Sequence, residues 1–445
     1  MSHDRPAFSR PVPAGRLARG ARLGALATGL AGGALAEGLR RLARGERPDL
    51  AAALMSAPNA QRLTGSLAHL RGAAMKLGQM LSLDAGLALP PELEAILARL
   101  RADAATMPPG QLRRVLAAEW GADWHRHFAR FDVRPIAAAS IGQVHRARTR
   151  DGRDLAIKVQ FPGVRASIDA DIANLGTLLR LSGMVPAGLD LAPLLDEARA
   201  QLHAEADYRA EARALAAFRD ALAGRAEFLV PALHADLSTG QVLAMDHVES
   251  VGIEALAGAT PARRDAAAAA LIDLVLRELF AFGRMQTDPN FANYRFAPES
   301  GRIVLLDFGA TRGIAPATAV RYRALLRALL ARDRPAIAAG MRALGYFGAG
   351  SPEAEKTLIV AMAEHASAPL RSDAPYDFAR STLPLDLAAM GRPLGEARRL
   401  WHVPPAELLF LHRKIAGMFL LAQRLRARVA LRPLVAPWAE PGAGS

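Results

Sequence analysis

The sequence predicts an α+β fold in which a small antiparallel sheet is flanked by long helical regions. Three observations lead to this prediction. Between residues 128 and 160, short runs of β-branched and apolar residues replace the alanine-rich helical pattern. The segment "TRDGRD" makes a tight hairpin turn between two of these runs. Later in the chain, two more strand-like runs, "NYRFAP" and "RIVLLDFG", are joined by the turn "ESG".

The composition is that of a folded protein of one large domain or two ordinary ones. Of 445 residues, 51% are hydrophobic and 22% are charged. The absence of cysteine excludes a disulfide framework, a zinc–thiolate site and a cysteine nucleophile. The net charge of +13 favours phosphate-rich partners. With only 5% aromatic residues and no zinc-finger spacing, no nucleic-acid partner is expected.

Residues 1–58 form the first region, a basic helical segment. Its uncharged stretch, Leu23 to Ala36, is too short to span a bilayer and has no cleavage site for a signal peptide. Two interpretations stay open: a small-residue helix lying on an anionic membrane surface, or an ordinary surface helix packed on the protein. Residues 59–127 follow as a helical extension, interrupted at "LPPE" and "TMPPG" where proline disfavours helix.

Residues 128–250 contain the predicted sheet. The runs "FARFDVRPI", "IGQVHRART" and "DLAIKVQF" predict three antiparallel strands, and "EFLVPALH" and "GQVLAMDHV" are expected to close the sheet region. Between these two groups of runs, one helix is expected from Val164 to about Ser182 and another from Pro193 to about Leu222. Residues 251–445 read as helical from Pro261 onward, apart from a loop and the late strand pair.

Phosphoryl transfer from ATP needs a lysine for the phosphates and a carboxylate that orients this lysine. Lys158, in the strand-like run "LAIKV", is the candidate lysine. The segment "HAEADYRAEA" is expected to place Glu205, Asp207 and Glu211 on one helix, and Glu211 is assigned as the partner of Lys158. The loop over the phosphates is "AAAS", whose methyl groups restrict the backbone where kinases have glycines. Its members are Ala137, Ala138, Ala139 and Ser140.

The same chemistry needs a carboxylate for the nucleophile and oxygen ligands for Mg²⁺. In "MQTDPNFANY", Asp288 and Asn293 have the Asp-x-x-x-x-Asn spacing of a kinase catalytic loop. Asp288 would orient the nucleophile, and the Asn293 oxygen would bind metal. Asp307, in "LLDFGATR", follows an apolar strand, where a carboxylate is costly unless a cation is present. Each motif alone is weak, whereas the ordered set is specific.

Over residues 60–430 the chain resembles the UbiB (AarF/Coq8-like, ABC1) family of atypical kinase-like proteins. "AAMKLGQM" looks like the family's Lys-x-Gly-Gln motif with Lys76 and Gln79, and "EADY" like its Glu-x-Asp motif with Glu205 and Asp207. "AAASIGQVH" resembles its alanine-rich loop. "QTDPNFAN" and "LLDFGATR" are similar to the Coq8-type branch.

The resemblance implies an atypical bilobal protein-kinase-like fold. It has a small antiparallel N-lobe sheet, a helical C-lobe and a helical N-terminal extension whose Lys-x-Gly-Gln helix meets the Glu-x-Asp helix in a regulatory role. It further implies binding of ATP and Mg²⁺ and support of ubiquinone biosynthesis at a membrane. The expected partners are ATP or ADP, a lipid or quinone-precursor ligand, an anionic membrane surface, ubiquinone-biosynthesis enzymes and, as an option, a second copy of the chain.

Three functional hypotheses follow. The first is an ATPase or small-molecule kinase, cytoplasmic and peripherally associated with the inner membrane. The second is a non-catalytic, nucleotide-gated scaffold that binds lipid intermediates or partner enzymes. The third, a protein kinase acting on other proteins, is disfavoured because Thr287 precedes Asp288 where an arginine would read an activation-loop phosphate, and no Ala-Pro-Glu motif follows Gly309.

Overall fold

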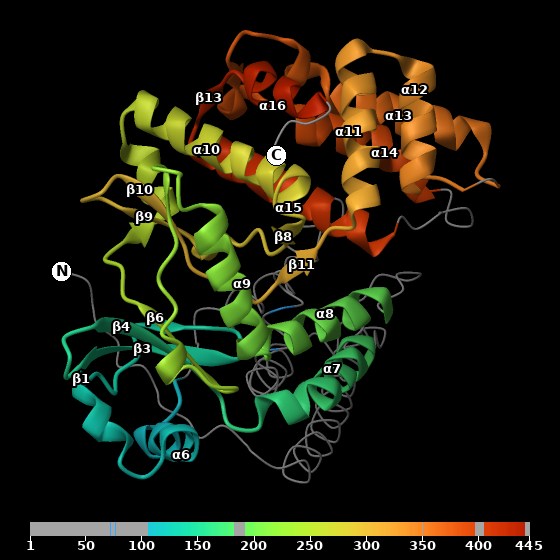
Figure 1. Cartoon of the computed structure of the whole chain (residues 1–445). Coiled ribbons are helices and arrows are strands. Elements are labelled where there is room, and N and C mark those ends of the chain that lie inside the picture. The colour runs from blue at the N-terminus through green and yellow to red at the C-terminus, as the bar shows by residue number, and fades with distance from the viewer. Residues whose placement is uncertain are drawn as a thin grey trace, which may run out of the picture. The chain divides into compact units, whose positions relative to one another are not determined.

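The computed structural model describes residues 72, 76, 106–181, 192–348, 350–396 and 405–440. The described chain divides into two compact units (Figure 1). The first contains the described residues up to Arg213 together with Ala232–His247. The second contains Ala214–Pro231 and the described residues from Val248 onward.

An antiparallel sheet forms the centre of the first unit. The strand order is β1-β3-β4-β6, and the short β2 pairs with β3. The three predicted strand runs and "GQVLAMDHV" are therefore all present. Gly152, with a φ of +94°, permits the predicted tight turn between β3 and β4. The strand bounds are β1 Phe128–Phe131, β2 Ala137–Ala138, β3 Gly142–Thr149, β4 Asp154–Gln160 and β6 Val242–Asp246.

One prediction about this sheet is wrong. "EFLVPALH" does not join it, because Phe228–Leu229 forms β5 in the second unit, parallel to β10, Arg302–Leu305. Phe228 is fully buried there, and β10 is itself a buried apolar run. Burial of the Phe228 side chain beside that strand stabilises β5 in this sheet.

Helices cover the sheet of the first unit. In α6, Pro109–Trp120, the buried residues Leu112, Val115 and Leu116 have helical spacing and pack against the buried side chains of β3, β4 and β6. The predicted helix after residue 163 is present as α7, Val164–Leu181.

The helix predicted from Pro193 to Leu222 is in fact two. α8, Ala192–Glu205, ends before α9, Tyr208–Ala221, begins. Asp207 causes the break, because its side chain accepts a hydrogen bond from the Ala210 amide at 3.0 Å and so caps α9. Aspartate favours this capping over a place inside a helix.

In its described residues, the second unit is built on helices with three small sheets. The predicted hairpin of β9, Tyr294–Ala297, and β10 is present, and Gly301, with a φ of +70°, makes the turn. The order of that sheet is β5-β10-β9-β7, where β7 is Val251–Gly252. A second sheet pairs β8, Arg284–Gln286, with β11, Thr311–Gly313. The third pairs β12, Tyr376–Asp377, with β13, Arg428–Val429.

Seven α-helices are described in the rest of this unit. They are α10 Pro261–Phe280, α11 Pro316–Ala331, α12 Arg334–Leu344, α13 Glu353–Ala366, α14 Leu383–Glu396, α15 Ala406–Arg424 and α16 Leu431–Ala439. Within the described residues, no helix is long and apolar enough to cross a membrane. The architecture agrees with the predicted α+β class.

Candidate active site

A buried ion pair lies at the centre of the first unit. Lys158 on β4 is flanked by Val144 and Leu243 on the neighbouring strands. Its Nζ lies 2.8 and 3.0 Å from the two carboxylate oxygens of Glu211 on α9. The side chains are 9% and 1% exposed, and the ammonium also lies 5.1 Å from the centre of the Tyr208 ring. A buried ammonium is tolerable only with such partners, so the strand and the helix hold the lysine in one place.

A second buried carboxylate joins three segments of this unit. Glu205, the last residue of α8, accepts a hydrogen bond from Lys76 Nζ at 2.5 Å on one oxygen. Its other oxygen accepts from the Ser140 hydroxyl. Lys76 is 1% exposed. Gly72, one helical turn before Lys76, lies against the same loop, since an added Cβ would be 3.3 Å from the Ser140 carbonyl oxygen. The pairing expected between the Lys-x-Gly-Gln and Glu-x-Asp segments is thus formed by Lys76 and Glu205.

The three acids do not share one helix, which corrects the prediction. Glu205 closes α8, Asp207 caps α9 and Glu211 lies in the first turn of α9. Gln160, buried on β4, donates its side-chain amide to the Ala206 carbonyl at the break, at 2.9 Å. The break directs Glu205 and Glu211 to different lysines. Gln79 and the basic N-terminal helix lie outside the described residues.

The alanine-rich loop is partly a strand. Ala137 and Ala138 pair with Val144 and Gln143, and the Ala139 amide donates to the Gly142 carbonyl at 2.9 Å. Ala137 and Ala138 are exposed, whereas Ala139 and Ser140 are half-buried. The Ala139 amide is therefore engaged within the hairpin in this conformation.

Gly142 is a sterically restricted position beside the lysine that the sequence analysis did not single out. A Cβ there would lie 2.4 Å from the Val159 carbonyl oxygen and 2.9 Å from the Tyr208 hydroxyl. Only glycine permits so close an approach of β3 to β4 beside the lysine. The available signal was a glycine two residues after the alanine-rich segment, at the start of a strand-like run.

The predicted catalytic loop lies in the second unit, between β8 and β9. Asn293 donates its side-chain amide to the Asp288 carbonyl at 3.2 Å, which leaves the Asn293 Oδ1 as the atom for a cation. The Asp288 carboxylate accepts a hydrogen bond from the backbone amide of Asn290 at 3.2 Å. Thr287 is buried, and both its amide and its hydroxyl donate to the Ala310 carbonyl, at 3.2 and 2.7 Å.

The hairpin register brings Asn293 and Asp307 to the same place. Leu305 pairs with Tyr294, and the Leu306 amide donates to the Asn293 carbonyl at 3.2 Å, so Asp307 follows at the same end of the hairpin. One Asp307 oxygen accepts from the Gly309 amide at 3.0 Å. The next residue, Phe308, is buried with its ring centre 4.9 Å from that of Phe218.

These donors fit Mg²⁺ bound together with a nucleotide. A carboxylate and an amide oxygen supply two hard ligands, and Mg²⁺ usually takes the rest from phosphate and water. Among the described residues there is no group of three or more His, Asp or Glu side chains that would form an all-protein metal site. The ligand set is therefore of the kind that phosphate oxygens complete.

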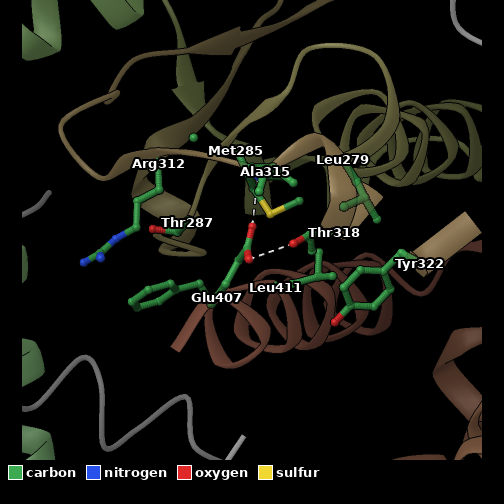
Figure 2. Close-up of a pocket in the computed structure, with 12 residues that line it drawn as sticks. Leu279, Met285, Thr287, Arg312, Ala315, Thr318, Tyr322, Glu407 and Leu411 are labelled. Carbon is green, nitrogen blue, oxygen red and sulfur yellow. Dashed lines mark hydrogen bonds between the residues drawn. The ribbon is translucent and has the colours of Figure 1, made fainter. Parts of the chain in front are cut away.

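A pocket of about 410 Å³ lies beside this loop within the second unit (Figure 2). Its walls are mainly apolar, and at its floor Glu407 accepts hydrogen bonds from the Ala315 amide and the Thr318 hydroxyl, at 3.2 and 2.9 Å. Thr287, the residue before Asp288, lines it. The volume is in the range of small-molecule sites. No local sequence pattern predicts this pocket, because its lining comes from β8, β11, α10, α11 and α15 and from the segments beside them.

Comparison with known proteins reveals extensive similarity. Residues 99–341 match the ABC1 atypical kinase-like domain. The chain is 37% identical over 421 residues to the Saccharomyces cerevisiae protein "Atypical kinase COQ8, mitochondrial". This match covers 94% of the present chain and 83% of the yeast protein. It is 36% identical over 376 residues to rat "Atypical kinase COQ8B, mitochondrial", covering 84% and 71%. A Caenorhabditis elegans relative, "Atypical kinase coq-8, mitochondrial", is 37% identical over 380 residues, but this match spans only half of its length.

Among solved structures, the chain is similar to Rv3197 of Mycobacterium tuberculosis, determined in complex with erythromycin. The TM-score is 0.56 at 26% identity, over 88% of this chain and 98% of that one.

Proposed function

This chain belongs to the ABC1 atypical kinase-like family, and on that premise we propose that it is a Mg²⁺-dependent ATP-binding enzyme, an ATPase or small-molecule kinase, that supports ubiquinone biosynthesis at a membrane. The observation that carries this proposal is the hairpin end where Asn293 and Asp307 meet beside Asp288. Oxygen ligands for a metal and a carboxylate for a nucleophile are the parts that phosphoryl transfer requires.

The roles follow from the chemistry of each side chain. Lys158, oriented by Glu211, is a fixed positive charge for the α- and β-phosphates. Asn293 and Asp307 hold Mg²⁺, which neutralises charge on the phosphate oxygens when bound. Asp288 orients the attacking hydroxyl or water and accepts its proton. Glu205, held by Lys76 and Ser140, ties the N-terminal extension to the alanine-rich loop, and this is a regulatory contact.

The pocket beside Thr287 supports a small-molecule ligand such as a lipid or quinone precursor. Met285, Phe410 and Leu411 give it an apolar wall, and Asp288 is the next residue after Thr287. The same residue argues against protein phosphorylation. The residue before Asp288 is a threonine and not the arginine that would read an activation-loop phosphate. Thr287 is buried, and its hydroxyl donates a hydrogen bond to the Ala310 carbonyl.

A nucleotide-gated scaffold is the alternative function. It is favoured by the contact of Ser140 with Glu205, since loop position and extension are then linked without any need for turnover. Asp288→Asn distinguishes the two. An enzyme loses ATP turnover with this variant and keeps Mg-ATP binding, whereas a scaffold shows no turnover in the wild type, with or without vesicles or an added phenol.

The biological role needs a cellular test. We expect a strain that lacks this protein to accumulate early quinone intermediates, and the wild-type chain but not Asp307→Asn to restore ubiquinone. Equal rescue by both chains would contradict the assignment of the metal site. The relatives named above are mitochondrial, and we propose peripheral association with the inner membrane for this chain, which the excess of basic residues in the sequence of residues 1–58 favours.

A further inference from the structure

A lysine with no exposed surface lies in the middle of α15. Lys414 is 0% exposed on a helix whose buried face also contains Leu411, Met418 and Leu421. Burying an ammonium is costly unless every N–H finds an acceptor. Its three N–H groups have three main acceptors: the Gln286 carbonyl at 2.8 Å, the Tyr294 hydroxyl at 2.9 Å and the Glu278 Oε1 at 3.3 Å.

Two of these acceptors are the two ends of the candidate catalytic loop. Gln286 is the last residue of β8, and Tyr294 is the first residue of β9. The seven residues between them, Thr287 to Asn293, include Asp288. One ammonium thus bonds to both ends of the loop and fixes the distance between them.

Glu278 on α10 supplies the opposite charge. It is 1% exposed, and one of its oxygens also accepts from the Gln286 amide at 3.4 Å. Burial lowers the pKa of Lys414, but the nearby Glu278 charge and the hydrogen bond to Tyr294 more than offset this and hold the pKa above its ordinary value. Lys414 is therefore a permanent cation.

A second contact lies one helical turn further along the same face of α15. An added Cβ at Gly417 would be 2.2 Å from the Cβ of Pro289 and 3.1 Å from its Cγ. Residues three apart on a helix share a face, so Lys414 and Gly417 both face the loop. Pro289 directly follows Asp288, and it is buried. Only glycine lets the loop approach the helix this closely.

We propose that the Lys414–Gly417 face of α15 is a positioning element for the loop from Thr287 to Asn293. Lys414 holds the two ends of the loop by hydrogen bonds, and Gly417 leaves the space that Pro289, within the loop, occupies. Neither residue touches the reacting atoms, and each acts through Asp288 and Asn293. The inference rests on the proposed function, because it assigns the loop's side chains to the nucleotide and its metal.

The test removes the loop anchor without leaving an unpaired buried charge. In the double variant Lys414→Met/Glu278→Gln both charges are absent, so the melting temperature should stay closer to the wild-type value than that of Lys414→Met alone. We expect kcat for ATP turnover to fall by about 100-fold, the loss that a displacement of about 1 Å can cause. The Mg²⁺ concentration for half-maximal rate should rise, because the Asn293 oxygen is displaced.

Gly417→Ala is an independent perturbation that changes no charge. Its methyl group displaces Pro289, and we expect a lower kcat and a higher Mg²⁺ requirement, as in the double variant. The matched control is Asp273→Asn, which breaks another ion pair on α10, with Arg277 at 2.7 Å, away from the loop. It should lower the melting temperature and leave kcat and the Mg²⁺ requirement unchanged.

The inference is overturned if the double variant and Gly417→Ala turn over ATP with the wild-type kcat and Mg²⁺ requirement. It is also overturned if Asp273→Asn loses as much kcat as they do, since turnover would then follow stability alone. The Asp288→Asn variant separates a failure of the proposed function from a failure of the positioning role. If it retains full turnover, the proposed function itself is wrong, whereas an inactive Asp288→Asn beside a fully active double variant refutes only the positioning role.

Discussion

Replacing Glu211 by glutamine tests whether the buried pair in the first unit holds Lys158. The variant keeps the shape and removes the charge from a side chain that is 1% exposed. Both carboxylate oxygens lie within 3.0 Å of the lysine Nζ, so the ammonium loses its main partner. Leaving a buried charge uncompensated costs about 3–5 kcal/mol. The Tyr208 ring at 5.1 Å persists and offsets part of this cost.

We therefore expect Glu211→Gln to lose about 3 kcal/mol of stability. For a unit of this size that corresponds to a melting temperature lower by roughly 6–12 °C. The double variant Lys158→Met/Glu211→Leu removes both charges and should recover most of the loss, because an apolar pair of similar volume is often as stable as a buried ion pair. It should nonetheless lose the stabilisation that Mg-ATP gives the wild type, since no cation is left for the phosphates.

Thermal unfolding with and without saturating Mg-ATP measures both effects in one experiment. Two results would refute the reasoning. Glu211→Gln could have the same melting temperature as the wild type, which would mean that the pair is not buried in solution. Alternatively, the double variant could be stabilised by Mg-ATP as strongly as the wild type, which would mean that Lys158 does not contact the nucleotide.

Three further outcomes are expected. Gly142→Ala should destabilise the protein by about 1–3 kcal/mol in urea unfolding, because its methyl group would overlap a carbonyl of the facing strand, and a wild-type midpoint would count against this. Burial lowers the pKa of His412 to about 4, and its Nε2 forms a hydrogen bond with the Tyr346 hydroxyl at 2.5 Å. The folded state thus binds the proton less readily than the unfolded state. The stability from neutral His412 is complete above about pH 6.5 and is lost as the pH falls toward 4, by about 3 kcal/mol; unfolding curves of wild type and His412→Gln should converge over that range. Lys76→Met should leave Glu205 without its cation and increase hydrogen exchange in the alanine-rich loop. Unchanged exchange would contradict the proposal that Glu205 connects the N-terminal extension to this loop.

The elements that the sequence predicted well are those with strong local signals. The β3–β4 hairpin has a glycine at its turn and alternating apolar residues, and α7 has a clear helical period. The order of Lys158, Asp288 and Asp307 along the chain was informative because each lies in a strand or loop whose local pattern is distinct.

The errors arose where a tertiary contact outweighed a local pattern. Residues 193–222 read as one helix because alanine and charged residues continue across the break, yet the Asp207 side chain caps a new helix there. Phe228 and Leu229 have strand character in any sheet, and only the position of β10 decides which sheet they join. Composition does not encode that position.

The sequence around Lys414 also contains a signal. Lys414 interrupts the apolar face of an amphipathic helix in "FLHRKIAGMFLL", where a lysine is either exposed or buried with acceptors. The acceptors Gln286, Tyr294 and Glu278 lie more than a hundred residues away in the sequence, so the choice between the two needs the fold.

The most direct test of the central claim is the change in melting temperature that Mg-ATP produces in the wild type and in Asp307→Asn. The proposed site predicts clear stabilisation of the wild type that a chelator of Mg²⁺ abolishes, and little or none for Asp307→Asn. Equal stabilisation of the two proteins, or none of the wild type, would contradict the assignment of Asp307 and its hairpin to a metal–nucleotide site.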